Sequence, residues 1–448
     1  MQVGFPRAGV AAYSLITWRR GVACLILAHF ALLLWLGLTR HWGLLTSLND
    51  LGVYDQAVWG ILHGAPFLNT SSALNTPINW LGFHFNPILA VFAPLYLVAE
   101  AAEWLILAQA LALSLSAWPI FLLAIRVIGS ERTASLWVLA YLANPFLLNA
   151  AAWDFHAVSL GVPFIALGLL AIESKNLRLL VGSCLILLTV QEHVGPLVAG
   201  LGLLWGIRNS SWRIGSLFAL LGIGHTLVVL GLIMPALSPT HSHPMLNAGL
   251  GQLSRYSWMG NSLGEIASYP FLHPGDFLKT VLFDFGGVVY LIGLLFSFLL
   301  LPLAGIAFLL PGMADLAANL LSANTMPRSP LSYHSVGLIP ILTIAAIQGG
   351  RVLCGWQQRF KQSEFAGMTA VTSICLGYIL APLPLPGATD FWAAKYYPWG
   401  PDPILPEVKS IISVDDSLSV QANVGAYFSQ RKAIYLFPAG LAGCSKTL

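Results

Sequence analysis

Long apolar runs dominate this sequence and constrain its fold more strongly than any motif does. A helix needs about 20 mostly apolar residues to cross the roughly 30 Å hydrocarbon core of a bilayer. We therefore predict an all-α polytopic membrane protein with about eleven transmembrane helices. The runs, some of them short or merging, lie at 19–39, 104–127, 133–151, 157–173, 177–191, 194–208, 214–234, 280–300, 303–321, 334–351 and 366–383.

The composition agrees with this class. Only 9% of the 448 residues are charged, whereas 57% are hydrophobic. A soluble domain carries about 25% charged residues, so these charges are too few to coat a water-facing surface of this size. The net charge of +3 says little about partners, and we expect membrane lipid but no nucleic acid. The five cysteines show no paired spacing typical of a disulfide framework or a metal site.

The placement of basic residues predicts the orientation, because Lys and Arg collect in cytoplasmic loops. Five basic clusters fall on one side only if the apolar run 85–99 does not cross, so we expect it to be an interfacial or re-entrant helix. The N-terminus is then cytoplasmic. The clusters are Arg19/Arg20, Arg126/Arg132, Lys175/Arg178, Arg208/Arg213 and Arg351/Arg359/Lys361.

This topology divides the chain into a transmembrane domain, 1–383, and a small extracytoplasmic C-terminal segment, 384–448. Two outer loops are long, the first at about 41–103 and another, expected to be mobile, at about 235–279. The C-terminal segment is too short for a substantial core of its own. We expect it to form a small cap, with strand-like pieces at Leu418 to Ala422 and Ala433 to Phe437.

The same topology gathers ionisable residues on the outer face. Asp50, Asp55, Asp154 and Glu192 fall at outer helix ends. Because ionisable groups at a membrane are costly, they mark functional sites by default. Nine of the eleven histidines join them on this face: His41, His63, His84, His156, His193, His241, His243, His273 and His334.

Residues 49–63, NDLGVYDQAVWGILH, predict an amphipathic helix that begins at Asp50. Its polar side carries Asp55, Trp59 and His63 at positions i, i+4 and i+8, with Gln56 beside them. A carboxylate can act as a general base near a membrane surface, where partial desolvation raises its pKa. Asp50 is our first catalytic candidate and Asp55 the second. Three alternatives stay open. Asp50 can be a helix N-cap, and Asp55 can be an acid on a solvated helix face. Trp59 can belong to the aromatic belt at the membrane interface instead of stacking on a sugar ring.

The remaining candidates are expected to bind substrate. His84 precedes a helix start, where free N–H groups suit a phosphate, and cations on the outer side can also bind phosphate. Asp154, His156 and Glu192 are also candidate ligands of a divalent metal, the one cofactor that we consider, although structural hydrogen bonds would explain them equally well. The full set is His84, Trp59, Gln56, Asp154, His156, Glu192, His193, Arg255, Tyr256, Arg328 and His334.

Several motifs together resemble a bacterial integral-membrane family, domain of unknown function 2079. They are Asp50-Leu51-Gly52 with Asp55-Gln56, His84-Phe85-Asn86-Pro87, Trp153-Asp154-Phe155-His156, Arg255-Tyr256 with Gly260 to Leu263, Tyr333-His334, and Ile434 to Pro438. The likeness covers about residues 45 to 438. The usual Lys-Glu-Asp of the family reads Gln191-Glu192-His193 here, so only Glu192 carries over.

That family looks related to the GT-C glycosyltransferases, which use polyprenyl-phosphate sugars and carry an acidic residue in the first outer loop. Asp50 matches that acid, although it is followed by Leu51 instead of a second acid. The resemblance implies a GT-C-like bundle in the bacterial inner membrane. It also implies transfer of a sugar from a polyprenyl-phosphate donor to an acceptor outside the cell membrane. A transporter or lipid flippase and a non-catalytic assembly factor stay open as alternatives.

Overall fold

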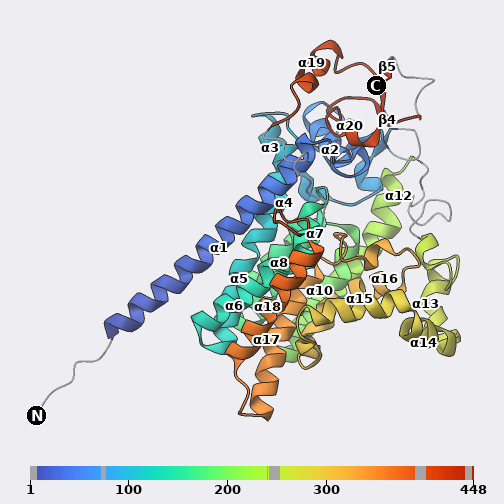
Figure 1. The fold of residues 1–448 in the computed structure, drawn as a ribbon. Coiled ribbons are helices and arrows are strands. Elements are labelled where there is room, and N and C mark those ends of the chain that lie inside the picture. The colour runs from blue at the N-terminus through green and yellow to red at the C-terminus, as the bar shows by residue number, and fades with distance from the viewer. Residues whose placement is uncertain are drawn as a thin grey trace, which may run out of the picture.

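The computed structural model describes residues 8–71, 77–239, 241, 253–388, 400–438 and 446–447, and they are mostly helical (Figure 1). The expected loop 235–279 and C-terminal segment therefore lie partly outside the described residues. The helices used below are α1 (Ala8–Trp42), α2 (Val53–Leu62), α3 (Ala93–Tyr96), α4 (Glu103–Leu115), α5 (Ala117–Ile128), α6 (Glu131–Leu142), α7 (Pro145–Ala152), α8 (Val158–Ser174), α9 (Leu177–Leu187), α10 (Gly195–Asn209), α11 (Trp212–Val228), α12 (Met234–Leu237), α13 (Leu263–Leu272), α14 (Pro274–Phe283), α15 (Phe285–Phe296), α16 (Met313–Leu321), α17 (Leu338–Trp356), α18 (Gln362–Leu380), α19 (Ile404–Ile411) and α20 (Ala422–Gly425).

Among the described residues, five helices are long and apolar enough to cross a membrane, or seven if each of two bent pairs is one span. The bent pairs are α6 with α7 and α14 with α15. The chain is thus an all-α membrane protein, but the expected eleven spans are not confirmed. Several predicted spans are short helices: α9, for example, has 11 residues, which rise about 16 Å, half of the bilayer core.

Close backbone packing fixes the start of α10. A side chain at Gly195 would overlap the backbone oxygen of Gly222 in α11, and one at Gly222 would overlap the oxygen of Gly195. Small residues allow membrane helices to approach in this way. The pairing of α10 with α11 therefore sets the position of the short 3₁₀ turn Glu192–Val194 that precedes α10.

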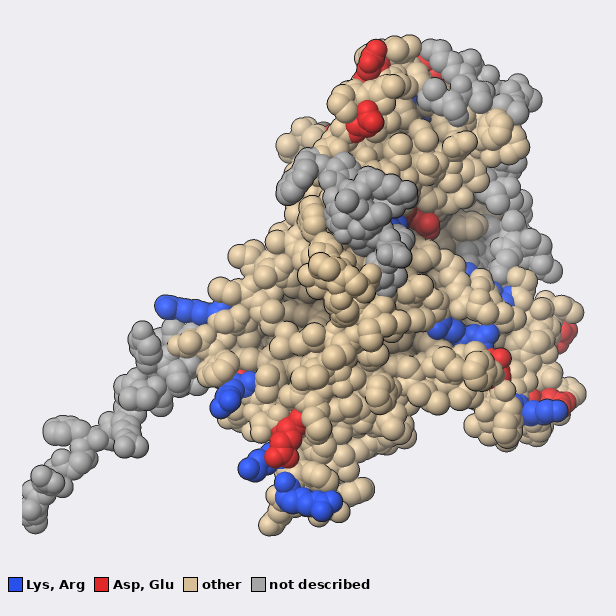
Figure 2. All heavy atoms as spheres, viewed as in Figure 1, with Lys and Arg blue, Asp and Glu red and all other residues tan. Residues whose placement is uncertain are grey.

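Charged residues tie helices together at one end of the bundle. Arg19 pairs with Glu131 at 2.8 Å, and Arg208 pairs with Glu173 at 2.9 Å. Arg126 donates a hydrogen bond to the backbone oxygen of Glu173. Figure 2 shows Lys and Arg side chains along this lower end, away from the C-terminal segment. That this end faces the cytoplasm stays a prediction.

The first loop builds the opposite end. After α1 the chain makes a π-helical turn (Leu48–Gly52), α2, and a two-stranded antiparallel pair, β1 (Leu68–Asn69) and β2 (Ile78–Asn79). The run 85–99 forms a 3₁₀ helix (Pro87–Phe92) followed by the short α3. It does not make a span, and it leaves Val91, Leu97 and Val98 exposed, as expected of a helix at the membrane surface.

The C-terminal segment packs on this loop. β3 (Leu418–Val420), β4 (Ile434–Leu436) and β5 (Lys446–Thr447) form a parallel sheet in the order β4-β3-β5, so both predicted strands are confirmed. Gln56 of α2 donates to the backbone oxygen of Arg431 at 2.9 Å, and the Thr70 hydroxyl donates to that of Ile434 at 2.9 Å.

Asp55 of α2 is completely buried in this contact. Its carboxylate accepts hydrogen bonds from the hydroxyls of Tyr96 (2.6 Å) and Ser429 (2.5 Å) and from the side chain of Gln430 (3.2 Å). Burial raises the pKa of this carboxyl, and the three donors oppose the shift. Asp55 therefore joins α2, α3 and the C-terminal segment.

We predict that Asp55→Ala loosens this contact, because it leaves the buried Tyr96 hydroxyl without its acceptor. It also removes one acceptor from Ser429, which still donates to Ala426, and one from the half-buried Gln430. A buried unsatisfied group costs roughly 1–3 kcal/mol, so we expect a loss of about 2 kcal/mol. The measurement is the unfolding temperature in detergent, together with the rate of proteolysis of the C-terminal segment. Asp415→Ala, which breaks an exposed pair with Lys432, should change both by little. Equal stability of the two variants would contradict the prediction.

Candidate active site

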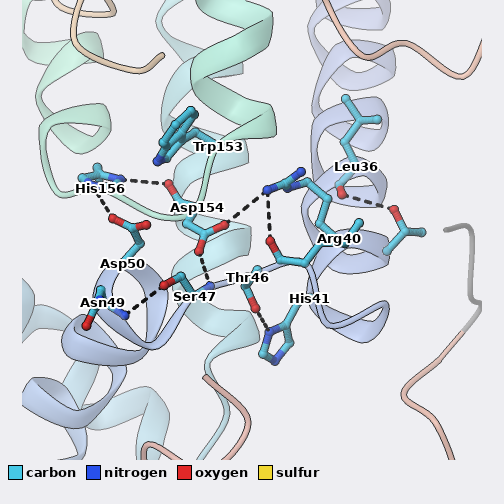
Figure 3. A network of polar contacts seen from close by, with 12 residues as sticks. Leu36, Arg40, His41, Thr46, Ser47, Asn49, Asp50, Trp153, Asp154 and His156 are labelled. Carbon is cyan, nitrogen blue, oxygen red and sulfur yellow. Dashed lines mark hydrogen bonds and ion pairs between the residues drawn. The ribbon is translucent and has the colours of Figure 1, made fainter. Parts of the chain in front are cut away.

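Asp50 lies in the π-helical turn that links α1 to α2. The N-cap of this turn is Ser47, whose hydroxyl accepts a hydrogen bond from the backbone N–H of Asn49 at 3.1 Å. Capping is thus done by Ser47 and not by Asp50. The Asp50 carboxylate turns instead toward His156, with Oδ1 3.4 Å from Nε2 (Figure 3). About a third of the Asp50 side chain is exposed.

The His156 ring is fixed on several sides. Its Nδ1 lies 3.0 Å from the backbone oxygen of Asp154, which can only accept, so Nδ1 carries a hydrogen. Nε2 is then the nitrogen that gains or loses a proton, and it faces Asp50. The backbone N–H of His156 donates to Gln109 at 3.0 Å, and its ring stacks on Tyr333 at 3.5 Å. Asp50 and His156 therefore form a carboxylate–imidazole pair able to hold and move a proton.

Asp154 lies beside this pair and is almost completely buried. One carboxylate oxygen accepts a hydrogen bond from the backbone N–H of Ser47 at 2.6 Å, and the other lies 3.5 Å from the guanidinium of Arg40. Burial raises the pKa of Asp154 to about 6, while the positive charge of Arg40 works against the shift.

Arg40 is a site residue that the sequence analysis missed. A signal was present, because an Arg at the outer end of the first span departs from the rule that places basic residues on the cytoplasmic side. Such a cation has to be matched by a local anion, and here Asp154 is that anion. The same reasoning had selected only Arg255 and Arg328.

A cavity of about 410 Å³ opens at this cluster. Asp50, Asp154, Arg40 and Trp153 line it, together with residues of α7 and α18. A second cavity, of about 570 Å³, also has Trp153 and Leu331 in its wall and contains Arg328. The two spaces therefore adjoin at Trp153. The first has the carboxylates of Asp50 and Asp154 with Arg40 in its wall, and the second has Arg328.

His334 and Arg255 lie next to this cluster. His334 stacks on Tyr333 with ring centres 4.3 Å apart. Burial lowers the pKa of His334 to about 3, and the positive charge of Arg255 adds to the effect. Tyr256 points elsewhere, since its hydroxyl donates to the backbone of Ala318 in α16 at 3.0 Å.

Glu192 belongs to a separate pair. Its carboxylate accepts from His84 Nδ1 and from the backbone N–H of Phe85, both at 2.9 Å. Burial alone would raise the pKa of Glu192, but pairing with His84 and the nearby His193 lower it to about 2. His84 thus binds the carboxylate of Glu192. Neither Glu192 nor His84 lines either of the two cavities. His193 is exposed beside them.

Three candidates on α2 are engaged away from the cavities. Asp55 and Gln56 bind the C-terminal segment, as described above. Trp59 is buried, stacks on His63 with ring centres 3.9 Å apart, and donates its indole N–H to Glu100 at 2.9 Å. These contacts support a structural role for all three.

Within the described residues, no group of three or more His, Cys, Asp or Glu side chains is arranged to hold a metal ion. Of the three candidate ligands, Asp154 and His156 lie in one cluster, while Glu192 pairs with His84. Arg40 and Asp50 already face the first two. Binding of a divalent ion stays a prediction.

The fold and this cluster define a polytopic membrane protein with a polar cavity at one end of its helical bundle. The chain belongs to the family described as "Predicted membrane protein (DUF2079)", whose family model matches residues 40–441. The match begins at Arg40 and so includes the whole cluster. None of the curated proteins matches the sequence.

We predict that Asp154 makes stability depend on pH. Its folded-state pKa of about 6 exceeds the ordinary value of 3.8, so the folded protein holds this proton more tightly than the unfolded chain does. The stability that this adds is fully present below about pH 4 and is lost as the pH rises through 6. The shift corresponds to about 3 kcal/mol. Unfolding temperatures in detergent between pH 4 and 7.5 should fall more steeply for the wild type than for Asp154→Asn. Asp415→Asn should keep the wild-type slope, and an unchanged slope in Asp154→Asn would refute the assignment.

Proposed function

We propose that this protein is a membrane glycosyltransferase of GT-C type, which moves a sugar from a polyprenyl-phosphate donor to an acceptor on the extracytoplasmic side. The observation that carries the proposal is the Asp50–His156 pair beside a cavity that Asp50 itself lines. Asp50 acts as the general base, taking the proton of the acceptor hydroxyl. His156 holds Asp50 in position and shares that proton.

The surroundings of Asp50 suit this role. Its carboxylate is partly exposed, so an acceptor can reach it, whereas Asp154 is held by Ser47 and Arg40. Asp154 and Arg40 then fix the loop that carries His156. Trp153 lies in the wall between the two cavities, where an indole can stack on a sugar ring. Positioning and proton transfer together are the usual means of such catalysis.

The sequence order also supports the proposal. The acid follows the first long apolar helix, and the loop that carries it contains the short surface helix Pro87–Tyr96, as in the GT-C pattern. In this proposal the end with the C-terminal segment lies outside the bacterial inner membrane, and the end with Arg126 and Arg208 lies in the cytoplasm. Glu192 and His84 then stabilise the first loop and do not touch the substrate.

Asp50→Asn tests the mechanism. The amide cannot accept the proton, so transfer should fall at least a hundredfold, which is typical of losing general base catalysis. The measurement uses purified protein and a panel of labelled polyprenyl-phosphate sugars, with and without a divalent ion. Asp415→Asn provides the same chemical change far from the cavity and should keep wild-type activity.

The unfolding temperature of Asp50→Asn should stay close to that of the wild type, since its carboxylate is not a buried anchor. A correctly folded Asp50→Asn protein with full activity would remove Asp50 from the mechanism.

A further inference from the structure

The ion pair between Arg328 and Asp284 lies where α14 meets α15. These two helices are bent by 59° at Asp284. Asp284 is the N-cap of α15 and accepts a hydrogen bond from the backbone N–H of Gly287 at 2.8 Å. The same carboxylate oxygen accepts from Nη1 of Arg328. One acidic side chain thus serves both the helix and the arginine.

Arg328 is built into the wall of a cavity. Its side chain is only 10% exposed, and it lines the 570 Å³ space next to Trp153. Its Nε has no hydrogen-bond partner among the residues that the structure describes. The hydroxyl residues Thr325, Ser329 and Ser332 line the same space. A guanidinium with unused donor capacity beside hydroxyls suits an anion with several oxygens.

Asp284 is much more accessible than its partner. Its side chain is 40% exposed, and its neighbours Phe283 and Phe285 are 78% and 81% exposed. Exposed phenylalanines of this kind in a membrane protein are typical of a side that faces lipid. Gly286, which follows Phe285, lines the cavity together with Arg328. Asp284 and the exposed Phe283 and Phe285 therefore lie in the segment that leads to this cationic wall, and we call that segment the rim.

We propose that this cavity binds the phosphate group of a lipid-linked phosphate, and that Asp284 occupies Arg328 until that phosphate displaces it. The proposal rests on the proposed function and deepens it, because it separates a phosphate chamber around Arg328 from the chamber that holds Asp50. Trp153, shared by both walls, then lies between the phosphate and the base. The lipid chain leaves past Phe283 and Phe285.

The exchange is favourable for simple reasons. A phosphate offers more acceptor oxygens than one carboxylate, and arginine binds it through two parallel hydrogen bonds. A chain of isoprene units adds burial of apolar surface at the rim. Asp284 keeps the backbone N–H of Gly287 as a partner when it leaves Arg328, so its displacement does not leave the N-terminus of α15 uncapped.

The test is a pair of substitutions at the ion pair. Asp284→Asn keeps the N-cap, since Asn caps helices as well as Asp, but it no longer competes for Arg328. We expect it to bind farnesyl phosphate about tenfold more tightly than the wild type, by isothermal titration calorimetry in detergent. Arg328→Gln should bind at least tenfold more weakly. Unchanged or weaker binding by Asp284→Asn overturns the proposal, even if Arg328→Gln fails to fold.

Asp276→Asn is the matched control. It removes one negative charge from the exposed first turn of α14, so it reports any general electrostatic gain, and its affinity should equal that of the wild type. An equal gain of affinity in Asp276→Asn and Asp284→Asn overturns the proposal that Asp284 competes with the phosphate for Arg328. The affinity for inorganic phosphate should be lower than that for farnesyl phosphate, but the substitutions at Arg328 and Asp284 should change it in the same directions. The affinity for farnesol, which has no phosphate, should not change with either substitution. Equal affinities for inorganic phosphate and farnesyl phosphate contradict the claim that the bound phosphate belongs to a lipid.

Binding is measured without turnover, so the two proposals can fail separately. Tighter binding by Asp284→Asn together with full transfer by Asp50→Asn would remove only the proposed base. Loss of transfer in Asp50→Asn with no change of affinity in Asp284→Asn would remove only the phosphate chamber.

Discussion

The arrangement of the candidate site depends on one buried carboxylate. Asp154 joins the end of α1, through Arg40, to the turn before α2, through the backbone N–H of Ser47. A buried charge needs such partners, because leaving it unpaired in an apolar surrounding costs several kcal/mol. The contact brings the turn that carries Asp50 against the segment that carries His156. The pairing of these two side chains therefore follows from how Asp154 is satisfied.

The sequence predicts the class of fold because apolar runs report directly on the environment of each segment. It predicts the number of spans less well, since a run can be continuous in hydropathy and still be divided in structure. Residues 303–321 show this: they contain a 3₁₀ helix, Ile306–Gly312, before α16. Likewise, α14 and α15 break at Asp284, within the apolar run 280–300.

The candidate site, too, could be predicted only in part from the sequence. Asp50, Asp154 and His156 could be predicted to meet, because all three fall at the outer ends of apolar runs. The different role of Asp55 could not be predicted, since helical periodicity describes only one element. Both faces of α2 are buried, and the second face is covered by residues about 375 positions later in the chain. Arg40 escaped notice because it lies inside an apolar helix and its partner is distant in sequence.

The cover over α2 has a consequence for biosynthesis. Tyr96 is made soon after Asp55, but Gln430 is made 375 residues later, directly after Ser429. Until then, part of the hydrogen-bonding capacity of Asp55 has to be met by water or by a chaperone. The first loop is thus made early and completed late, so a chain that stalls before Ser429 would present an unfinished surface to quality-control proteases.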